Sequence, residues 1–242
     1  MAAERTLVYF VADVHLGLKV GDPAEREARF LRFLGGIDPE KTRALYLLGD
    51  IWDFWYEYRD VIPHEGIRVV HALMTLMDAG VEVCFFPGNH DIWCYSFFER
   101  IGIRKLEQPC FLTLDGKTFC LGHGDELGRK RHSFLYVLFH SRIVQALFST
   151  LHPWIAYRFA LAWSDSNRRK RKQYSFTEDA PLYRYALQES AERPVDFFVF
   201  GHYHVDVDRA LPSGGRFVIL KDWIGAERTP YAVFDGRELS VF

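Results

Sequence analysis

The chain has 242 residues, of which 49% are hydrophobic, and its formal net charge at pH 7 is −2. This length and composition allow one domain, residues 1–242, to bury a substantial core. They exclude a membrane-spanning helix, because no run of eighteen or more apolar residues occurs. The N-terminus also lacks the charged and apolar order of a secretory signal, and the four cysteines form no C-x-x-C pair. We therefore expect a cytoplasmic monomer with free thiols.

Apolar runs and helical segments alternate in the first half of the chain. The apolar runs predict buried strands at residues 7–12, 45–48 and 81–86. Helices are predicted at 24–34 and 67–79, and the second is followed by Gly80, where a glycine commonly ends a helix. This alternation is typical of an α/β fold.

Short strands dominate the remainder of the chain. The dipeptide Asp115-Gly116 predicts a hairpin turn with a strand on each side, and Asp235-Gly236 marks a second tight turn. Further short strands are predicted at residues 197–200, 216–220, 231–234 and 239–242. The whole pattern predicts two layers of sheet with helices outside them.

One segment, residues 129–172, differs from the rest in charge. It contains ten Lys and Arg residues against one acid, Asp165, and many aromatic residues are interleaved. Its apolar residues recur at every fourth position, which supports an amphipathic helix. This series consists of Leu135, Phe139, Ile143, Leu147 and Leu151. Because Pro153 suits the start of a second helix, we expect a helical hairpin inserted at about residues 128–176.

Three interpretations of this insertion are open. It can be an ordinary packed helix pair whose basic run, residues 168–172, is a solvated surface. It can contact nucleic acid, since basic and aromatic residues together suit a phosphate backbone with stacked bases. It can be an apolar cap with a cationic rim, which admits acyl chains and rests on an anionic membrane surface. We favour the third interpretation, which suits a lipid that carries phosphate, and we expect no nucleic-acid partner.

Five short polar patches follow apolar, strand-like runs. In an open α/β sheet the carboxyl ends of the strands share one edge, so side chains far apart in sequence can meet there. The candidate metal ligands are Asp13, His15, Asp50, Asn89, His123, His202 and His204. His90 and Asp91 follow directly after Asn89. We expect these side chains to form one site.

The donor types of this site indicate transition metals. Oxygen donors mixed with imidazoles suit manganese, iron or zinc, whereas calcium and magnesium favour oxygen donors alone. Seven ligands are too many for one tetrahedral ion but suit two octahedral ions if a carboxylate bridges them. We expect Asp50 to be this bridge, because Gly49 before it lets the backbone come close. Two ions about 4 Å apart can hold both the attacking and the leaving oxygens of a phosphoryl displacement.

The order of the patches resembles that of the calcineurin-like metallophosphoesterase superfamily. Its motifs D-x-H, G-D, G-N-H-D, G-H and G-H-x-H all occur unaltered, and the ordered set is far more specific than any single patch. The resemblance implies a two-sheet αββα sandwich, two divalent metal ions and a phosphohydrolase. We assign three residues to catalysis: Asn89 and His90 stabilise charge in the transition state, and Asp91 orients an imidazole.

The chain further resembles a narrower family, the UDP-2,3-diacylglucosamine diphosphatases of lipid A biosynthesis, over nearly its whole length. The shared features include His123-Gly124-Asp125 before the insertion, the helical insertion itself, and the run from Trp163 to Arg171 that closes it. The resemblance implies hydrolysis of the pyrophosphate of UDP-2,3-diacylglucosamine to UMP and 2,3-diacylglucosamine 1-phosphate, with manganese. It also implies a peripheral protein on the cytoplasmic face of the inner membrane.

Contacts with the substrate head group are expected both before the insertion and within it. The candidates are His90, Asp125, Ser164, Ser166, Asn167 and Arg168. The better-known branch of the family has Arg in place of His90, whereas the wider superfamily has His and often uses it as a proton donor. This departure leaves two roles open for His90, proton donor or electrostatic stabiliser, and it leaves open a different nucleotide-linked substrate.

Other functions are open to the same fold. A nuclease, a cyclic-nucleotide phosphodiesterase or another nucleotide-linked pyrophosphatase would use the same pair of metals. A nuclease needs an open basic trench, whereas the acyl-lipid function requires an apolar groove within residues 129–172. A non-catalytic binding scaffold would have lost ligands, and none is lost here.

Overall fold

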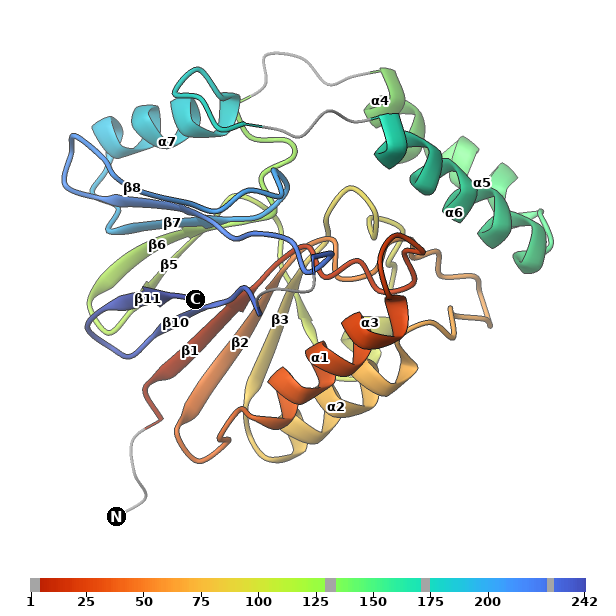
Figure 1. The fold of residues 1–242 in the computed structure, drawn as a ribbon, viewed down its shortest axis with the longest axis horizontal. Coiled ribbons are helices and arrows are strands. Elements are labelled where there is room, and N and C mark those ends of the chain that lie inside the picture. Colours follow the sequence, from red (N-terminus) through yellow and green to blue (C-terminus); the bar gives the residue numbers. More distant parts are fainter. Residues whose placement is uncertain (1–4, 129–133, 171–174, 226–228) are drawn as a thin grey trace.

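The computed structural model has two β-sheets packed face to face, with helices on their outer surfaces (Figure 1). The structure describes residues 5–128, 134–170, 175–225 and 229–242. One sheet is covered by α1 (Pro23–Gly35) and α2 (Ile67–Asp78), and the other by α7 (Pro181–Glu192). This arrangement is the αββα sandwich that the sequence predicted.

The first sheet has six strands in the order β11-β10-β1-β2-β3-β4. Strands β1 to β4 run parallel, while β10 is antiparallel to both of its neighbours. The strands are β1 (Leu7–Val11), β2 (Thr42–Leu48), β3 (Glu82–Phe86), β4 (Arg104–Lys105), β10 (Ala232–Phe234) and β11 (Leu239–Val241). The carboxyl ends of β1, β2 and β3 therefore lie along one edge of the sheet.

The second sheet has five strands in the order β5-β6-β7-β9-β8. They are β5 (Cys110–Leu114), β6 (Lys117–Leu121), β7 (Phe197–Phe200), β8 (Val207–Ala210) and β9 (Arg216–Ile219). The predicted hairpin joins β5 and β6. Its turn residues Asp115 and Gly116 have φ of 46° and 80°, the positive values that a tight two-residue hairpin turn requires.

Aromatic side chains fill the space between the sheets and fix them together. Phe10 of β1 stacks on Phe119 of β6, with ring centroids 5.6 Å apart. Full burial of a side chain of this size contributes roughly 1.5–3 kcal/mol to folding. Ala12 belongs to the same core and directly precedes Asp13, so the packing between the sheets sets the position of the first metal-ligand motif.

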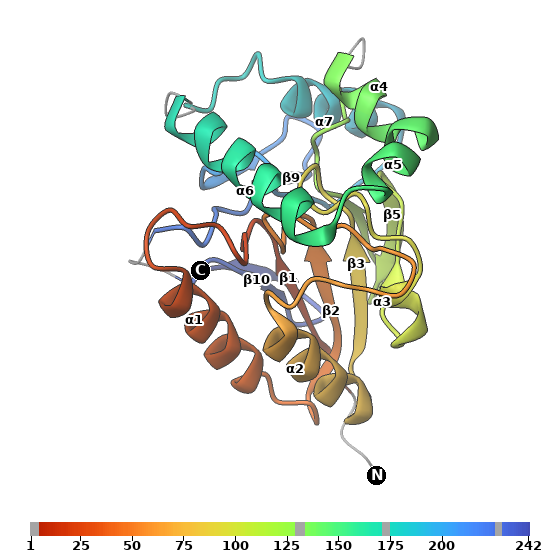
Figure 2. The same cartoon turned by 90° about the vertical axis from the view of Figure 1, so that its right-hand side faces the viewer.

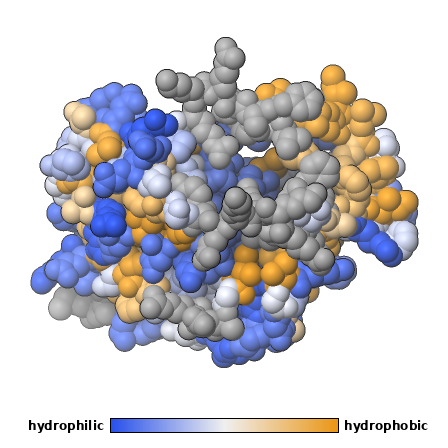
Figure 3. Space-filling model, turned by 45° about the horizontal axis from the view of Figure 1, so that its top comes forward, coloured by the Kyte–Doolittle hydropathy of each residue, from blue (hydrophilic) through white to orange (hydrophobic). Residues whose placement is uncertain are grey.

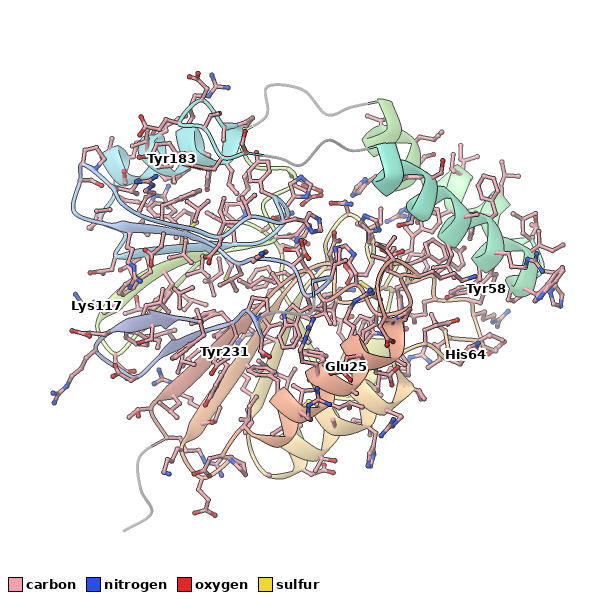
Figure 4. The ribbon with its side chains drawn as sticks, viewed as in Figure 1. Glu25, Tyr58, His64, Lys117, Tyr183 and Tyr231 are labelled. Atoms are coloured by element: carbon pink, nitrogen blue, oxygen red, sulfur yellow. The ribbon has the colours of Figure 1, made fainter. Side chains whose placement is uncertain are left out.

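The sequence did not predict four elements, namely α3 (Phe97–Arg100), α7, β4 and β8. Helix α3 has four residues and β4 has two, so neither is long enough to develop a hydrophobic period. Helix α7 begins at Pro181, a residue well suited to the first helical position. It covers the second sheet through Tyr183, whose ring lies 5.2 Å from that of Phe217 in β9 (Figure 4).

The insertion lies beyond the carboxyl ends of β1, β2 and β3 (Figures 1 and 2). We call its helices the cap: α4 (Phe134–His140), α5 (Arg142–Ser149) and α6 (Pro153–Lys170). The sequence predicted one helix before α6, but Ser141 is extended (φ −69°, ψ 119°) and divides it into two. The apolar series is divided as well. Ile143 and Leu147 are 73% and 65% exposed, whereas Phe139 packs against the sandwich.

Two expectations from composition concern membranes and thiols. No helix within the described ranges is long and apolar enough to cross a membrane. All four cysteines are free, and three of them are buried. Burial raises the pKa of the Cys84 thiol to about 12, so this thiol stays protonated and unreactive at neutral pH.

Candidate metal centre

The motif residues converge at the edge of the sandwich that faces the cap. Asp13 and His15 follow β1, and Asp50 follows β2. The remaining candidate ligands follow β3, β6 and β7, and they are Asn89, His123, His202 and His204. Backbone hydrogen bonds align the first two loops, because the amide of Asp13 donates to the Gly49 carbonyl and the amide of His15 donates to the Asp50 carbonyl, both at 3.0 Å.

Five of these residues have a left-handed backbone conformation. The φ angles of Asp13, His15 and Asp50 are 53°, 53° and 52°. Those of His202 and His204 are 72° and 57°. A side chain in this region costs roughly 1–2 kcal/mol per residue, and such strain concentrates at functional sites. The loops therefore hold the candidate ligands in conformations that stability alone would not favour.

The two carboxylate oxygens of Asp13 have different neighbours, a backbone amide on one side and two imidazoles on the other. Its Oδ2 accepts the amide of His202 at 2.8 Å. Its Oδ1 lies 3.6 Å from Nε2 of His15 and 3.7 Å from Nε2 of His204. One oxygen thus fixes the carboxylate, and the other is presented to the site.

The two carboxylate oxygens of Asp50 also have different neighbours. Oδ1 accepts a backbone amide, and Oδ2 faces two candidate ligands. Its Oδ1 accepts the amide of His90 at 2.8 Å. Its Oδ2 lies 3.8 Å from Nε2 of His15 and 3.4 Å from Nε2 of His123. His15 also faces Asp13. A single oxygen of Asp50 therefore lies between the Asp13–His15 pair and His123.

Carboxylates that sit behind the imidazoles orient two of the candidate ligands. Nδ1 of His15 lies 3.2 Å from Oδ1 of Asp53, and Nδ1 of His204 lies 3.1 Å from Oδ2 of Asp222. A carboxylate at Nδ1 favours the tautomer whose Nε2 carries the lone pair, and it makes that nitrogen a better ligand. The sequence analysis identified neither Asp53 nor Asp222 in this role.

His123 is held by the strand that precedes Asp50. Its Nδ1 donates to the carbonyl of Leu48 at 2.9 Å, so the Nε2 lone pair faces the centre. Gly49 has φ +83°, and a Cβ there would lie 2.6 Å from ring atoms of His123. The sequence suggested that Gly49 lets the Asp50 backbone come close; the structure shows that it makes room for the imidazole of His123.

Two other motif glycines make room for the carboxylates. A Cβ at Gly88 would lie 2.3 Å from Oδ1 of Asp50. A Cβ at Gly201 would lie 2.3 Å from Oδ2 of Asp13. In both cases this is the oxygen that a backbone amide holds, so any side chain at the glycine would displace a candidate ligand.

The donor set fits two divalent metal ions. One group of candidate ligand atoms, all within 4.8 Å of one another, comes from Asp13, His15, Asp50 and His204. On the other side of Asp50, the rings of His123 and His202 lie 5.1 Å apart. Among the described residues, the buried atoms Asp13 Oδ1, Asn89 Oδ1 and His123 Nε2 have no hydrogen-bond partner. Buried polar atoms rarely lack partners, and a cation on each side of Asp50 would satisfy all three.

The charges of the centre are mutually dependent. Burial opposes ionisation of Asp50, but the imidazoles of His123 and His90 overcome it and hold the pKa of Asp50 well below its ordinary value. Burial likewise opposes protonation of His123, yet the carboxylates of Asp50 and Asp13 raise its pKa well above the ordinary value. Protons and metal ions therefore compete for the same buried lone pairs.

His90 lies at the mouth of the centre, where 19% of its side chain is exposed. Its Nδ1 donates to the carbonyl of Asp53 at 2.8 Å. Its Nε2 is thereby directed inward, 4.0 Å from Oδ2 of Asp50. In the neutral ring Nε2 is an acceptor, and in the imidazolium it is a donor, so the second form alone can donate a hydrogen bond or a proton to a phosphoryl oxygen.

The sequence predicted that Asp91 orients an imidazole, whereas the structure places its carboxylate against the backbone. Its fully buried carboxylate accepts four backbone N–H groups at 2.7–3.3 Å, those of Gly88, Asp50, Ile51 and Trp52. Burial, together with the nearby charge of Asp50, raises the pKa of Asp91 to about 7. Asp91 thus shapes the loop that carries Asp50, whereas other carboxylates contact the imidazoles.

Asp125, an expected substrate contact, is buried in the loop after His123. Its Oδ1 accepts Nε2 of Gln108 at 2.7 Å, and Oε1 of the same glutamine accepts the amide of Gly124 at 2.7 Å. Gln108 therefore fixes both the side chain and the backbone of this loop. No motif marks it in the sequence.

The four expected contacts on the cap all lie in α6. Ser164 is buried, and its Oγ has no hydrogen-bond partner within the described part of the chain. Ser166 is exposed. Asn167 and Arg168 belong to the same helix, but their side chains lie outside those described. The role of these four residues stays a prediction.

The fold and the site define a metallophosphoesterase. Residues 6–206 match the family model of the calcineurin-like phosphoesterases, and the chain belongs to this family. It is similar to a UDP-2,3-diacylglucosamine hydrolase of Porphyromonas gingivalis, with 36% identity in an alignment that covers 97% of this chain and 96% of the relative. It is also similar to the protein of that name from Stenotrophomonas maltophilia, with 31% identity in an alignment that covers 88% of this chain and 90% of the relative. A solved dimetal phosphatase from Danio rerio matches with a TM-score of 0.46 and 14% identity, covering 98% of each chain.

Proposed function

We propose that the protein hydrolyses the pyrophosphate of UDP-2,3-diacylglucosamine to UMP and 2,3-diacylglucosamine 1-phosphate. The observation that carries the proposal is the single oxygen of Asp50 placed between two groups of metal ligands, at the edge of the sandwich that the cap faces. The similarity to a relative named for hydrolysis of this substrate, at 36% identity over nearly the whole chain, supports the same substrate here.

The ligands divide into two sets that share Asp50. The first set would consist of Asp13, His15, Asp50 and His204. The second would consist of Asp50, Asn89, His123 and His202. When bound, two divalent ions at these positions supply Lewis acidity that activates water and neutralises charge on the phosphoryl group. Mixed oxygen and imidazole donors favour manganese over magnesium, and we propose Mn²⁺ as the working metal.

The protein's own contribution to the reaction is to position groups and balance charge. His90 presents Nε2 from a ring that the Asp53 carbonyl fixes at Nδ1. As an imidazolium it stabilises negative charge that develops on a phosphoryl oxygen. Asn89 Oδ1 is buried beside it, ready to bind a cation, and Asp91 keeps the backbone of the Asp50 loop in place.

We further propose that 1–242 is one domain and that the insertion at about 128–176 receives the acyl chains. The cap helices and the turn between α5 and α6 carry several exposed apolar side chains: Val137, Ile143, Leu147, Leu151, Trp154, Ile155 and Phe159. Figure 3 shows the hydrophobic area that they help to form. The guanidinium of Arg158 lies 4.7 Å from the Trp154 ring, so a cation borders this apolar surface. Such a surface favours peripheral contact of a monomer with an anionic inner membrane over contact with nucleic acid.

Product analysis tests the proposed reaction. Purified protein with Mn²⁺ should convert UDP-2,3-diacylglucosamine to UMP and the sugar 1-phosphate, which phosphorus NMR distinguishes, and EDTA should stop the conversion. Release of UDP, or persistence of the substrate with metal present, would contradict the proposal.

A further inference from the structure

Two loops hold His90 between them. The ring of His90 donates to the carbonyl of Asp53 at 2.8 Å. The backbone carbonyl of His90 accepts the amide of Trp55 at 3.3 Å. Further along, the amide of Glu57 donates to the carbonyl of Trp93 at 3.0 Å. Loop 51–58 therefore fixes both the side chain and the backbone of His90, which lies in loop 89–97.

Glu57 joins the two loops a second time. Its side chain is buried, and its carboxylate accepts the amides of Tyr95, Ser96 and Phe97 at 2.6–3.0 Å. These amides lie at the start of α3, where unpaired N–H groups favour a negative charge. Loops 51–58 and 89–97 thus behave as one unit.

The cap contacts this unit on both loops through Gln145 of α5. The carbonyl of Gln145 accepts the hydroxyl of Tyr56 at 2.8 Å, and its Oε1 accepts the hydroxyl of Tyr95 at 3.0 Å. Its Nε2 donates to the carbonyl of Phe139 at 2.9 Å, and the same carbonyl accepts Nε1 of Trp93 at 2.8 Å. One residue of the cap is therefore bonded to each loop.

Aromatic packing supports the same junction. The hydroxyl of Tyr157 in α6 donates to the carbonyl of Tyr56 at 3.0 Å, and its ring lies 5.1 Å from that of Phe54. The ring of Phe148 in α5 lies 4.8 Å from Tyr56 and 4.9 Å from Trp93. Figure 2 shows α6 crossing in front of the carboxyl ends of the strands, where these loops begin. The cap is thus seated on the loops by both polar and aromatic contacts.

We propose that the seated cap holds His90 in its working position, with Gln145 as the positioning residue that joins the cap to both loops. The link runs from Gln145 through Tyr56 to loop 51–58, which binds the ring of His90, and through Tyr95 to loop 89–97, which carries it. Movement of the cap and alignment of His90 are then one event, so occupancy of the cap changes the rate of phosphoryl transfer. The inference rests on the proposed phosphohydrolase activity, but not on the identity of the lipid.

A small diester that has no acyl chains separates positioning from lipid binding. The carbonyl that accepts Tyr56 is in the backbone and survives in Gln145→Ala, so the test uses the double variant Tyr56→Phe/Gln145→Ala, which removes both hydrogen bonds. With bis(p-nitrophenyl) phosphate this double variant should lower kcat about tenfold while metal content stays unchanged. In a His90→Ala background the same change should have no further effect, because there is no imidazole left to position. The matched control is Gln188→Ala, at an exposed glutamine of α7, which should leave the rate unchanged. Undiminished hydrolysis by Tyr56→Phe/Gln145→Ala, or a full tenfold loss without His90, would overturn the proposal.

Amide exchange gives a readout that does not require turnover. The amides of Trp55 and Glu57 donate across the two loops, so their hydrogen exchange should accelerate about tenfold or more in Tyr56→Phe/Gln145→Ala and stay unchanged in Gln188→Ala. Unaltered protection of these amides would show that the cap does not hold the loops, and would overturn the inference. A wild-type protein that hydrolyses neither ester nor lipid would instead contradict the proposed function, while the exchange measurement still decides the coupling.

Discussion

Nε2 of His123 faces Oδ2 of Asp50 across 3.4 Å, and both side chains are almost fully buried. Because Nδ1 of His123 donates to the carbonyl of Leu48, the neutral ring has no proton at Nε2. Two lone pairs would then face each other inside the protein, an arrangement that needs a proton or a cation between them. We therefore propose that the pair belongs to a metal site whose second half lies on the other side of Asp50.

Asp50→Ala should remove both metals together. The same oxygen faces His15 at 3.8 Å and His123 at 3.4 Å, so its loss weakens both ligand sets. We expect the Mn²⁺ content to fall to background and turnover to vanish. Asp78→Ala, at an exposed aspartate that ends α2, is the control and should bind both metals. Elemental analysis with full metal content in Asp50→Ala would rule out the bridge.

Gly49→Ala should damage the centre through His123. The new methyl group would meet the imidazole ring at 2.6 Å, in a backbone with φ +83°. Gly116→Ala is a matched control, because Gly116 has φ +80° but nothing within 4 Å of its Cβ position. Both variants should lose roughly 1–2 kcal/mol of stability from the backbone alone. In titrations with Mn²⁺, Gly49→Ala alone should lose affinity, and equal binding by the two variants would disprove the steric role.

His90→Ala should lower kcat roughly a hundredfold or more and leave the metals bound, because His90 stabilises transition-state charge without being a ligand. His90→Arg separates its two possible roles, since Arg retains the positive charge but does not release a proton near neutral pH. Partial activity of His90→Arg supports electrostatic stabilisation, and complete inactivity with metals bound supports proton donation. An unchanged kcat in His90→Ala would remove this residue from the catalytic group.

Asp222→Ala should weaken metal binding without abolishing it. The carboxylate lies 3.1 Å from Nδ1 of His204 and fixes the tautomer and orientation of that ring. Loss of such an orienting partner typically lowers metal affinity about 10–100-fold. Equilibrium dialysis should show this loss, and saturating Mn²⁺ should restore most of the rate. Wild-type affinity would mean that the contact does not orient His204.

The sequence was sufficient to predict the fold and the convergence of the site. Strands β1, β2 and β3 each end in an uninterrupted apolar run, so their carboxyl ends could be predicted from residue type alone. Parallel strands of one sheet share an edge, which explains how Asp13 and Asp50 meet. His202 follows β7 of the other sheet, so the face-to-face packing of the two sheets brings it to Asp13, 189 residues away in sequence. The glycines of the motifs could also be recognised in the sequence, but the side chains that lie next to them in space could not be predicted.

The supporting residues could not be predicted because tertiary packing alone defines them. Asp222 follows His204 by 18 residues, with no pattern to connect the two. Gln108 and Gln145 are polar residues of ordinary appearance, and the same residue types more often face solvent. The break at Ser141 was missed because the four-residue apolar repeat continues across it, while only the backbone of that residue departs from the helix.

Acyl dependence tests the central claim, that this dimetal centre serves a lipid held by the cap. Each methylene buried by the cap should contribute about 0.8 kcal/mol, so two long chains outweigh most head-group contacts. The decisive measurement is kcat/KM for UDP-2,3-diacylglucosamine against deacylated UDP-glucosamine, with a single-stranded oligonucleotide as the third substrate. We predict rapid hydrolysis of the diacylated substrate, very poor hydrolysis of the deacylated one and none of the oligonucleotide. Equal kcat/KM for the first two, or oligonucleotide cleavage with a steep salt dependence, would contradict the claim.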